Sequence, residues 1–372
     1  MGNKAMTLAK SRKKDEFYTS LDVIEQEMVY YRKYFEGKTI FLNCDDPDWS
    51  NFWVYFSLNF DFLGINKLIS THYDSDEKKS SYVLSLEANG KGNSPNEPVV
   101  VKTHLKGNGD FRSEECIELL EESDIVITNP PFSLWREYVA QLVEYDKKFI
   151  ILGNQNAVSY KEVFPLFKDN KIWFGSSISS GDREFRVPDD YPLNASGTRI
   201  DDQGNKYIRV KGVRWFTNLD HKKRHEELVL TSFYEGNEDY YPTFDNFNAI
   251  EVGVTKEIPL DYTGVMGVPL TFLDKYSPDQ FEILGISKPA LYTVSNDDAL
   301  PTKRYTDALQ HNKNGSSQSG GKVNDGATLL FSEKPESVYY TANESDGYFI
   351  QKYTRIFVRN KKPVSKKDML GF

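Results

Sequence analysis

Cysteine and histidine are scarce in this chain, with two cysteines and five histidines among 372 residues. Cys44 and Cys116 do not form a Cys-x-x-Cys pair, and the histidines do not cluster at metal-ligand spacing. We therefore expect no disulfide framework, no structural zinc and no metal at the functional site. The low cysteine content also predicts a cytoplasmic protein, because disulfides are features of oxidising compartments.

Long apolar runs are also missing. No stretch approaches the roughly 18 apolar residues of a membrane-spanning helix, and residues 1–14 carry scattered Lys and Arg without the apolar segment of a secretory signal. We therefore expect no membrane association. The formal net charge of −9 excludes a uniformly basic surface. A local basic groove for nucleic acid is still compatible with that charge.

The most informative feature that is present is the motif Asn129-Pro130-Pro131-Phe132. It follows 124–128, a short β-branched run that predicts a buried strand, and ligands of open α/β folds bind where strands leave the sheet. The Asn129 side-chain carbonyl and the Pro130 backbone carbonyl can accept hydrogen bonds from a planar amino group. The prolines stiffen the turn, and the Phe132 ring can stack on a base.

This motif fits a general pattern in which Asp, Asn or Ser is followed by two prolines and an aromatic residue. The pattern is typical of enzymes that methylate exocyclic or amide nitrogen with S-adenosylmethionine. Asn-Pro and Pro-Pro are also ordinary turn residues. The position of the motif directly after a strand favours the functional interpretation.

Strand-like and helix-like segments alternate through residue 170, which predicts an α/β fold with a parallel, doubly wound sheet. The expected strands are 39–43, 67–72, 99–102, 124–128 and 148–153, and the expected helices are 21–35, 51–62, 113–122, 134–145 and 160–169. Residues 75–98 are polar and predict a surface excursion with room for a hairpin.

After residue 170 the pattern changes to short strands, expected at 171–175, 207–210, 213–217 and 353–359. Basic and aromatic residues interleave over 199–225, which predicts either a solvated β-rich face or the wall of a nucleic-acid cleft. The basic segment 1–14 is likewise either a frayed terminus or an arm that lies along phosphates. Residues 296–325 have low complexity and predict a flexible surface insertion.

The chain is therefore divided into five parts. We expect a basic N-terminal arm (1–14), a cofactor-binding catalytic domain (15–170), a target-recognition region that completes the sheet (171–286), a variable and partly flexible insertion (287–350), and a C-terminal strand and tail (351–372).

Several segments, taken together, carry a family resemblance. They are Asp15-Glu16-Phe17-Tyr18-Thr19, Asn43-Cys44-Asp45-Asp46-Pro47, Gly109-Asp110-Phe111-Arg112, and the stretches 123–133, 145–149, 160–164, 170–173, 215–220, 258–262 and 264–269. With these segments the chain resembles the EcoRI-type adenine-specific DNA methyltransferases over roughly 12–285 and the last short strand. The resemblance implies a class I, Rossmann-like methyltransferase fold, S-adenosylmethionine as methyl donor, and N6 of a flipped-out adenine in duplex DNA as acceptor.

The resemblance also implies roles for single residues. By similarity, the cofactor would be bound by Phe17, Tyr18, Thr19, Asn43, Asp45, Asp46, Asp110, Phe111 and Asn129. Asn129, Pro130, Pro131 and Phe132 would hold the target base. Phe174 and Phe185 are our candidates for the opposite face of that base. We expect Lys13, Lys14, Arg199, Lys206, Arg209, Arg214, Lys222 and Lys223 to contact DNA.

The chain departs from related enzymes in its first cofactor loop. Residues 46–52 contain no glycine, although many amino-methyltransferases have a glycine-rich loop there, and Ser20 stands where proline is often found. No acidic residue is clearly placed for the ribose hydroxyls, for which Asp74 is a candidate.

Three alternatives stay open on the residues alone. The acceptor could be RNA adenine or a protein glutamine amide, or the chain could be a catalytically silent protein that binds DNA or the cofactor. The basic and aromatic region favours DNA over a peptide, and the intact Asn129 turn argues against a silent protein. By resemblance, GAATTC is the natural guess for the recognition site, a monomer is expected, and a cognate restriction endonuclease is a candidate partner.

Overall fold

The computed structural model describes residues 18–74, 81–88, 98–178, 181–187, 189, 191, 193, 197–343 and 345–370. Lys13, Lys14 and Phe17, together with the predicted arm 1–14, lie outside the described residues. The chain forms two compact units, one from 1–157 and 172–223 and the other from 158–171 and 224–372. Among the described helices, none has the length and apolar character needed to cross a membrane.

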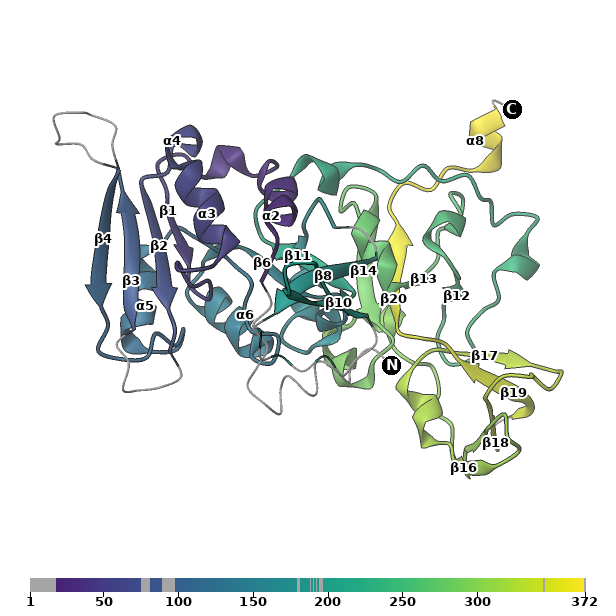
Figure 1. Cartoon of the computed structure of the whole chain (residues 1–372). Helices are drawn as coiled ribbons and strands as arrows, with labels where there is room; N and C mark the ends of the chain where they lie inside the picture. Colours follow the sequence, from purple (N-terminus) through teal and green to yellow (C-terminus); the bar gives the residue numbers. More distant parts are fainter. Residues whose placement is uncertain are drawn as a thin grey trace. The chain divides into compact units, whose positions relative to one another are not determined.

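An eight-stranded sheet with the order β4-β3-β2-β1-β5-β6-β11-β7 forms the centre of the first unit (Figure 1). Neighbours in the series β2-β1-β5-β6 pair in parallel, whereas β11 is antiparallel to β6. The remaining neighbours also pair antiparallel. The bounds are β1 Thr39–Leu42, β2 Lys67–His72, β3 Tyr82–Glu87, β4 Val99–His104, β5 Ile125–Thr128, β6 Lys148–Asn154, β7 Trp173–Phe174 and β11 Val213–Thr217.

Helices cover both faces of this sheet. The side chains of Ile40 and Leu42 belong to one hydrophobic cluster with buried residues of α2, α3 and α4. Phe41 points to the other face by strand alternation, where α5 packs on β1 and α6 on β6. The helices of this unit are α2 Leu21–Met28, α3 Asn51–Leu58, α4 Phe60–Leu63, α5 Glu114–Glu122 and α6 Trp135–Glu144.

A smaller antiparallel sheet, β8-β10-β9, also belongs to the first unit. Phe185 of β8 and Ile208 of β10 are buried in the same cluster as α2 and α3, so the inner face of this sheet packs into the core. Arg186 of β8 and Arg209 and Lys211 of β10 are exposed on the outer face. The bounds are β8 Asp182–Val187, β9 Thr198–Ile200 and β10 Lys206–Lys211.

The second unit contains two sheets, β12-β13-β20-β14 and β16-β15-β18-β19-β17. The four-stranded sheet has a buried ion pair in which Arg355 Nη2 lies 2.6 Å from Glu251 Oε1. The elements are α7 Phe164–Lys168, α8 Lys366–Leu370, β12 Ile250–Glu251, β13 Met266–Pro269, β14 Phe281–Ile286, β15 Leu309–His311, β16 Ser317–Ser319, β17 Thr328–Phe331, β18 Tyr339–Ala342, β19 Ser345–Gln351 and β20 Arg355–Asn360.

Short 3-10 helices connect these elements along the chain. They are Arg32–Tyr34, Gln155–Ser159, Lys222–His225, Glu238–Tyr240, Thr255–Glu257, Leu270–Lys275, Pro289–Val294, Asp297–Ala299 and Gly321–Asp325.

The α/β class is confirmed, and three local predictions need correction. The polar segment 75–98 contains β3, which pairs with β2 along its whole length. The helix expected at 160–169 is shortened to α7, because Pro165 occupies its first turn. The stretch predicted to be flexible, 296–325, contributes a hairpin to the five-stranded sheet, where Tyr305, Val323, Tyr340 and Phe349 form a small core.

Candidate active site

The carboxyl ends of β1, β2 and β5 meet at one edge of the large sheet because these strands run parallel. Thr71 Oγ1 at the end of β2 donates to the carbonyl oxygen of Asn43, just after β1, at 2.9 Å. His72 Nδ1 lies 2.5 Å from Asp46 Oδ2. The two loops that leave β1 and β2 are thereby fixed to each other at the edge where ligands of such sheets bind.

Asp45 connects the loop after β1 to the turn after β5. Its Oδ2 accepts hydrogen bonds from Thr128 Oγ1 at 2.5 Å and from the Asn129 backbone N–H at 3.0 Å. Its Oδ1 accepts from Ser50 Oγ at 2.8 Å. Burial raises the pKa of Asp45 to about 6, although these hydrogen bonds favour the charged form.

The segment before α2 crosses the Asn129 turn. Asn129 Nδ2 donates to Thr19 Oγ1 at 3.2 Å, and Asn51 Nδ2 donates to the Thr19 carbonyl oxygen at 2.7 Å. The Tyr18 N–H donates to the Arg186 carbonyl oxygen of β8 at 2.9 Å. Residues far apart in the sequence therefore meet at the Asn-Pro-Pro-Phe turn.

The loop between β4 and α5 closes the site from the side of β2. Gly109 has a φ of +78°, and a Cβ there would stand 2.4 Å from the His72 carbonyl oxygen, so only glycine fits. Asp110 accepts two hydrogen bonds from the Arg112 guanidinium, at 2.8 and 2.7 Å, and this contact lowers the pKa of the carboxyl. The Phe111 ring packs edge-on against Tyr138, with centroids 5.1 Å apart.

Asn43 has a buried donor that no described residue satisfies. Its Oδ1 accepts from Tyr138 Oη at 2.8 Å, while Nδ2 has no hydrogen-bond partner among the described residues. Asn43 is only 3% exposed. Since buried polar groups are normally paired, this amide nitrogen fits an acceptor atom of a bound ligand.

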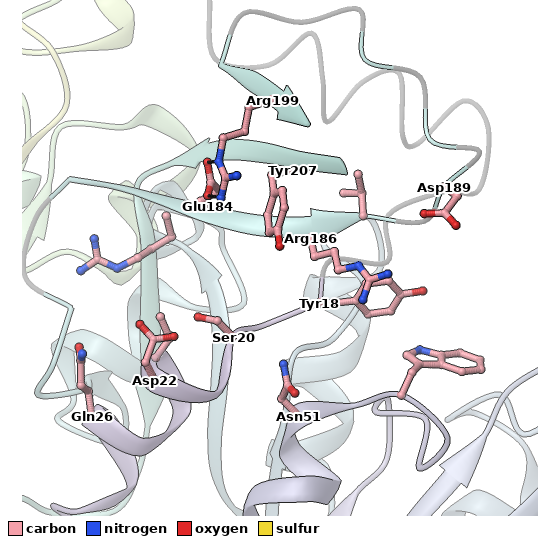
Figure 2. A pocket seen from close by; sticks show the side chains of 14 residues that line it. Tyr18, Ser20, Asp22, Gln26, Asn51, Glu184, Arg186, Asp189, Arg199 and Tyr207 are labelled. Atoms are coloured by element: carbon pink, nitrogen blue, oxygen red, sulfur yellow. Dashed lines mark hydrogen bonds and ion pairs between the residues drawn. The ribbon is translucent and has the colours of Figure 1, made fainter. Parts of the chain in front are cut away.

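A polar cavity of about 960 Å³ lies between the Tyr18–Ser20 segment and the β8-β10-β9 sheet (Figure 2). Figure 2 shows Ser20 and Asn51 on one side of it, and Glu184 and Tyr207 on the other. The Arg186 side chain is exposed and has no hydrogen bond or ion pair with any residue that the structure describes. The lining residues are Tyr18, Ser20, Asp22, Val23, Gln26, Trp49, Asn51, Arg183, Glu184, Arg186, Val187, Asp189, Arg199 and Tyr207.

Comparisons with known proteins identify the family. The family model described as "Adenine-specific methyltransferase EcoRI" matches residues 5–361. The chain belongs to this family. The family resemblance seen in the sequence is therefore confirmed, and with it the prediction of an adenine-specific methyltransferase.

Three curated relatives are similar over most of their length. The Type II methyltransferase M.EcoRI of Escherichia coli is 48% identical over 294 residues, which cover 77% of this chain and 90% of that protein. M.MgeORF184P of Mycoplasma genitalium is 42% identical over 74% of this chain and 84% of its own length. M.MpnI of Mycoplasma pneumoniae is 40% identical over 80% and 89%, respectively. No solved structure matches significantly.

Three residues that we expected to contact DNA lie in the interior of the methyltransferase. Phe174 is 6% exposed and packs on Phe216, and Phe185 is 2% exposed within the main core. Arg214 is 2% exposed on β11, which lies between β6 and the edge strand β7. These side chains present no surface to a base or a phosphate, so core packing is the better interpretation of all three.

The other described basic candidates are at least partly accessible. Arg209 and Lys222 are exposed. Arg199 is paired with Glu184 and lies over the Tyr207 ring, 4.0 Å from its centroid. Lys206 donates to the Tyr191 carbonyl oxygen, and Lys223 donates to that of Ser176.

The cofactor and base candidates differ in exposure. Phe111 is only 4% exposed, and Phe132 is partly buried against the main core. Asp46 is buried, which raises its pKa, and its contacts with the Asp48 backbone N–H and with His72 oppose that rise. Asp46, Asp48 and His72 bring three potential metal-ligand atoms within 4.8 Å of one another, a grouping that their sequence spacing did not suggest.

Sequence reasoning missed several residues of the site. Thr128 and Ser50 bind Asp45, Asn51 binds Thr19, and Tyr138 binds Asn43. Ser50 could have been found as a helix N-cap, because its Oγ accepts from the Phe52 N–H. No sequence pattern indicated Arg186 or Trp49, because their place at the cavity depends on tertiary contacts.

Proposed function

We propose that this methyltransferase transfers the methyl group of S-adenosylmethionine to N6 of an adenine flipped out of duplex DNA. The observation that carries the proposal is the Asn129–Phe132 turn at the carboxyl end of β5, tied to the loop after β1 and to Thr19. A flipped base is needed because the adenine amino group is inaccessible inside a duplex.

We propose further that the first unit is a class I, Rossmann-like methyltransferase domain. The parallel series β2-β1-β5-β6, followed by antiparallel β11, supports a doubly wound arrangement with its ligand site at the carboxyl edge. Within the functional division, 15–170 supplies the cofactor site, 171–286 adds β7 and β11 and the recognition residues, and 287–350 is an additional folded region.

The buried edge residues suit S-adenosylmethionine, a ligand with amino, carboxylate and hydroxyl groups. Asn43 Nδ2 is a buried donor without a partner among the described residues, and Asp46 and Asp110 offer carboxylates at the same edge. In this assignment Tyr18 and Thr19 approach the methionine part, and Phe111 lies beside the adenine part. The cofactor supplies an electrophilic methyl group on a sulfonium sulfur.

The chain's own contribution is to orient the target amino group and polarise it. The Asn129 side-chain carbonyl and the Pro130 backbone carbonyl accept its two hydrogen atoms. That contact withdraws the nitrogen from conjugation with the ring and localises its lone pair toward the methyl group. Stabilisation of this kind grows toward the transition state, where it accelerates the reaction.

Thr19 fixes which end of the Asn129 amide faces the base. Because Nδ2 donates to Thr19 Oγ1, the carbonyl end of the amide is directed away from that hydroxyl. The transferring atoms need close alignment, which supplies a large part of the rate. No strong base is required in this scheme, since the proton can leave after the transfer.

The DNA strand reaches the site through the cavity beside β8 and β10 in this proposal. Tyr18, Trp49 and Tyr207 offer aromatic surfaces for an unstacked nucleotide, and Arg186 offers an accessible guanidinium for a phosphate. Arg199, Arg209 and Lys222 extend the basic surface. GAATTC is the first sequence to test, with a monomer as the acting species and a cognate endonuclease as a candidate partner.

Methyl transfer from labelled S-adenosylmethionine tests the proposal directly when DNA, RNA and protein are offered as parallel acceptors. We expect label on N6 of DNA adenine. Label on RNA adenine or protein glutamine would replace the acceptor in the proposal. Cofactor binding without any transfer would instead indicate a silent binding protein.

A further inference from the structure

The Asn129 turn has very few backbone donors that could hold it in place. Pro130 and Pro131 have no N–H, so Asn129 supplies the only backbone N–H of these three residues. Asp45 Oδ2 accepts that N–H at 3.0 Å. The position of the turn therefore depends on a side chain from a different loop.

Both oxygens of the Asp45 carboxylate accept hydrogen bonds from within the protein. Oδ2 also accepts a hydrogen bond from the hydroxyl of Thr128, the last residue of β5. Oδ1 accepts a hydrogen bond from the hydroxyl of Ser50, the residue that caps α3. The Ser70 hydroxyl of β2 donates to the Asp45 backbone carbonyl. Asp45 is 9% exposed. One residue thus joins the ends of β1, β2 and β5 to the start of α3.

We propose that Asp45 is a positioning residue for methyl transfer, whose carboxylate fixes the backbone of Asn129 and does not contact the cofactor. This inference rests on the proposed function, because it acts through the base-holding role of Asn129. It replaces the cofactor-binding role that the family resemblance implied for Asp45.

Two substitutions separate the effect of the Asp45 charge from the effect of its hydrogen bonds. In Asp45→Asn, the remaining oxygen can accept from Thr128 and Asn129 if the new amide nitrogen faces Ser50. The Ser50 hydroxyl has two lone pairs and accepts one hydrogen bond, from Phe52, so it can accept a second. Asp45→Ala removes all three contacts. The asparagine variant should therefore keep the turn, and the alanine variant should release it.

The experiment measures single-turnover methyl transfer and the Kd for S-adenosylhomocysteine in the full-length enzyme. We expect Asp45→Ala to slow transfer about 100-fold, the range expected when hydrogen bonds to a charged group are lost, with a Kd within about fivefold of wild type. Asp45→Asn should restore most of the rate at pH 8. Asp61→Ala on α4, an exposed aspartate away from the turn, is the matched control.

Several outcomes would overturn the inference. Transfer by Asp45→Ala at nearly the wild-type rate would do so, as would a loss of S-adenosylhomocysteine binding that is equal in both Asp45 variants. If Asp45→Ala does not fold, Thr128→Val gives a second test, with about tenfold slower transfer expected from one lost hydrogen bond and an unchanged Kd. An unchanged rate there would contradict the inference. A wild-type enzyme that methylates no adenine would instead refute the proposed function.

Discussion

Replacement of Asn129 by alanine tests the base-holding turn most sharply. The change removes the side-chain carbonyl proposed to accept from the adenine amino group, and it leaves the backbone N–H that binds Asp45. Loss of one preorganised hydrogen-bonding group at a reacting centre typically slows the chemical step about 100- to 1,000-fold. We expect a reduction of that size in the single-turnover rate.

The same variant should bind the cofactor almost normally. Among its contacts with described residues it loses the hydrogen bond from Asn129 Nδ2 to Thr19 Oγ1, at 3.2 Å. A neutral hydrogen bond contributes about 1 kcal/mol, which corresponds to about a fivefold change in Kd.

The assay combines rapid-quench methyl transfer with calorimetric titration of S-adenosylhomocysteine. Asn59→Ala, which removes an amide whose Nδ2 donates to the Tyr55 carbonyl oxygen, is the matched control. A single-turnover rate reduced by less than about tenfold would refute the base-holding role of Asn129. A Kd for S-adenosylhomocysteine that rises by the same factor as the rate falls would also refute it.

Three further predictions concern stability, the cofactor loop and DNA. Glu27→Ala should lower the free energy of unfolding by about 3 kcal/mol, because it leaves two buried donors, from Tyr31 and Ser176, and a part-buried donor from Ser177 without their acceptor. Chemical denaturation measures this, with the exposed Glu25→Ala as control, and a change below about 1 kcal/mol would contradict it. Gly109→Ala should weaken S-adenosylhomocysteine binding, since its Cβ would clash with the His72 carbonyl oxygen. Gly107→Ala is the control, because a Cβ there lies 3.5 Å from Glu115 Oε2, an ordinary contact distance. Equal affinities of the two variants would refute this reasoning. Arg186→Ala should reduce the slope of log K for DNA binding against log salt concentration by about one. Lys33→Ala, at another exposed cation, is the control. The same slope in both variants would show that Arg186 does not contact DNA.

Much of the first unit could be predicted from the sequence because its signals are local. The apolar runs at β1, β2, β5 and β6 and the capping serines of α3 and α5 mark the elements directly. The Asn-Pro-Pro-Phe turn lies after β5, where the pattern placed it. β3 was expected only as part of a hairpin in a surface excursion, because its segment is polar around a short apolar stretch and its pairing with β2 is a tertiary contact.

The errors at the site have a common physical origin. Phe174 and Phe185 lie on the short strands β7 and β8, which mix buried and accessible residues, and composition alone does not tell which of them face the core. Arg214 lies on β11, a strand whose residues are all buried, and its basic side chain suggested the opposite. The hydrogen bonds of Asp45, which the resemblance places in a cofactor loop, were also not predicted, because two of them join residues more than 80 positions apart in the sequence. Such long-range contacts leave no periodic signal.

The most direct test of the central claim is the position of methyl groups on DNA. The chain would be expressed in a host without adenine methylation, and the genomic DNA would be sequenced by a method that detects N6-methyladenine. The account predicts N6-methyladenine at one defined sequence, with GAATTC tested first, and its disappearance in Asn129→Ala. Unmodified adenines with an expressed, folded wild-type protein, or methylation of another base, would contradict it.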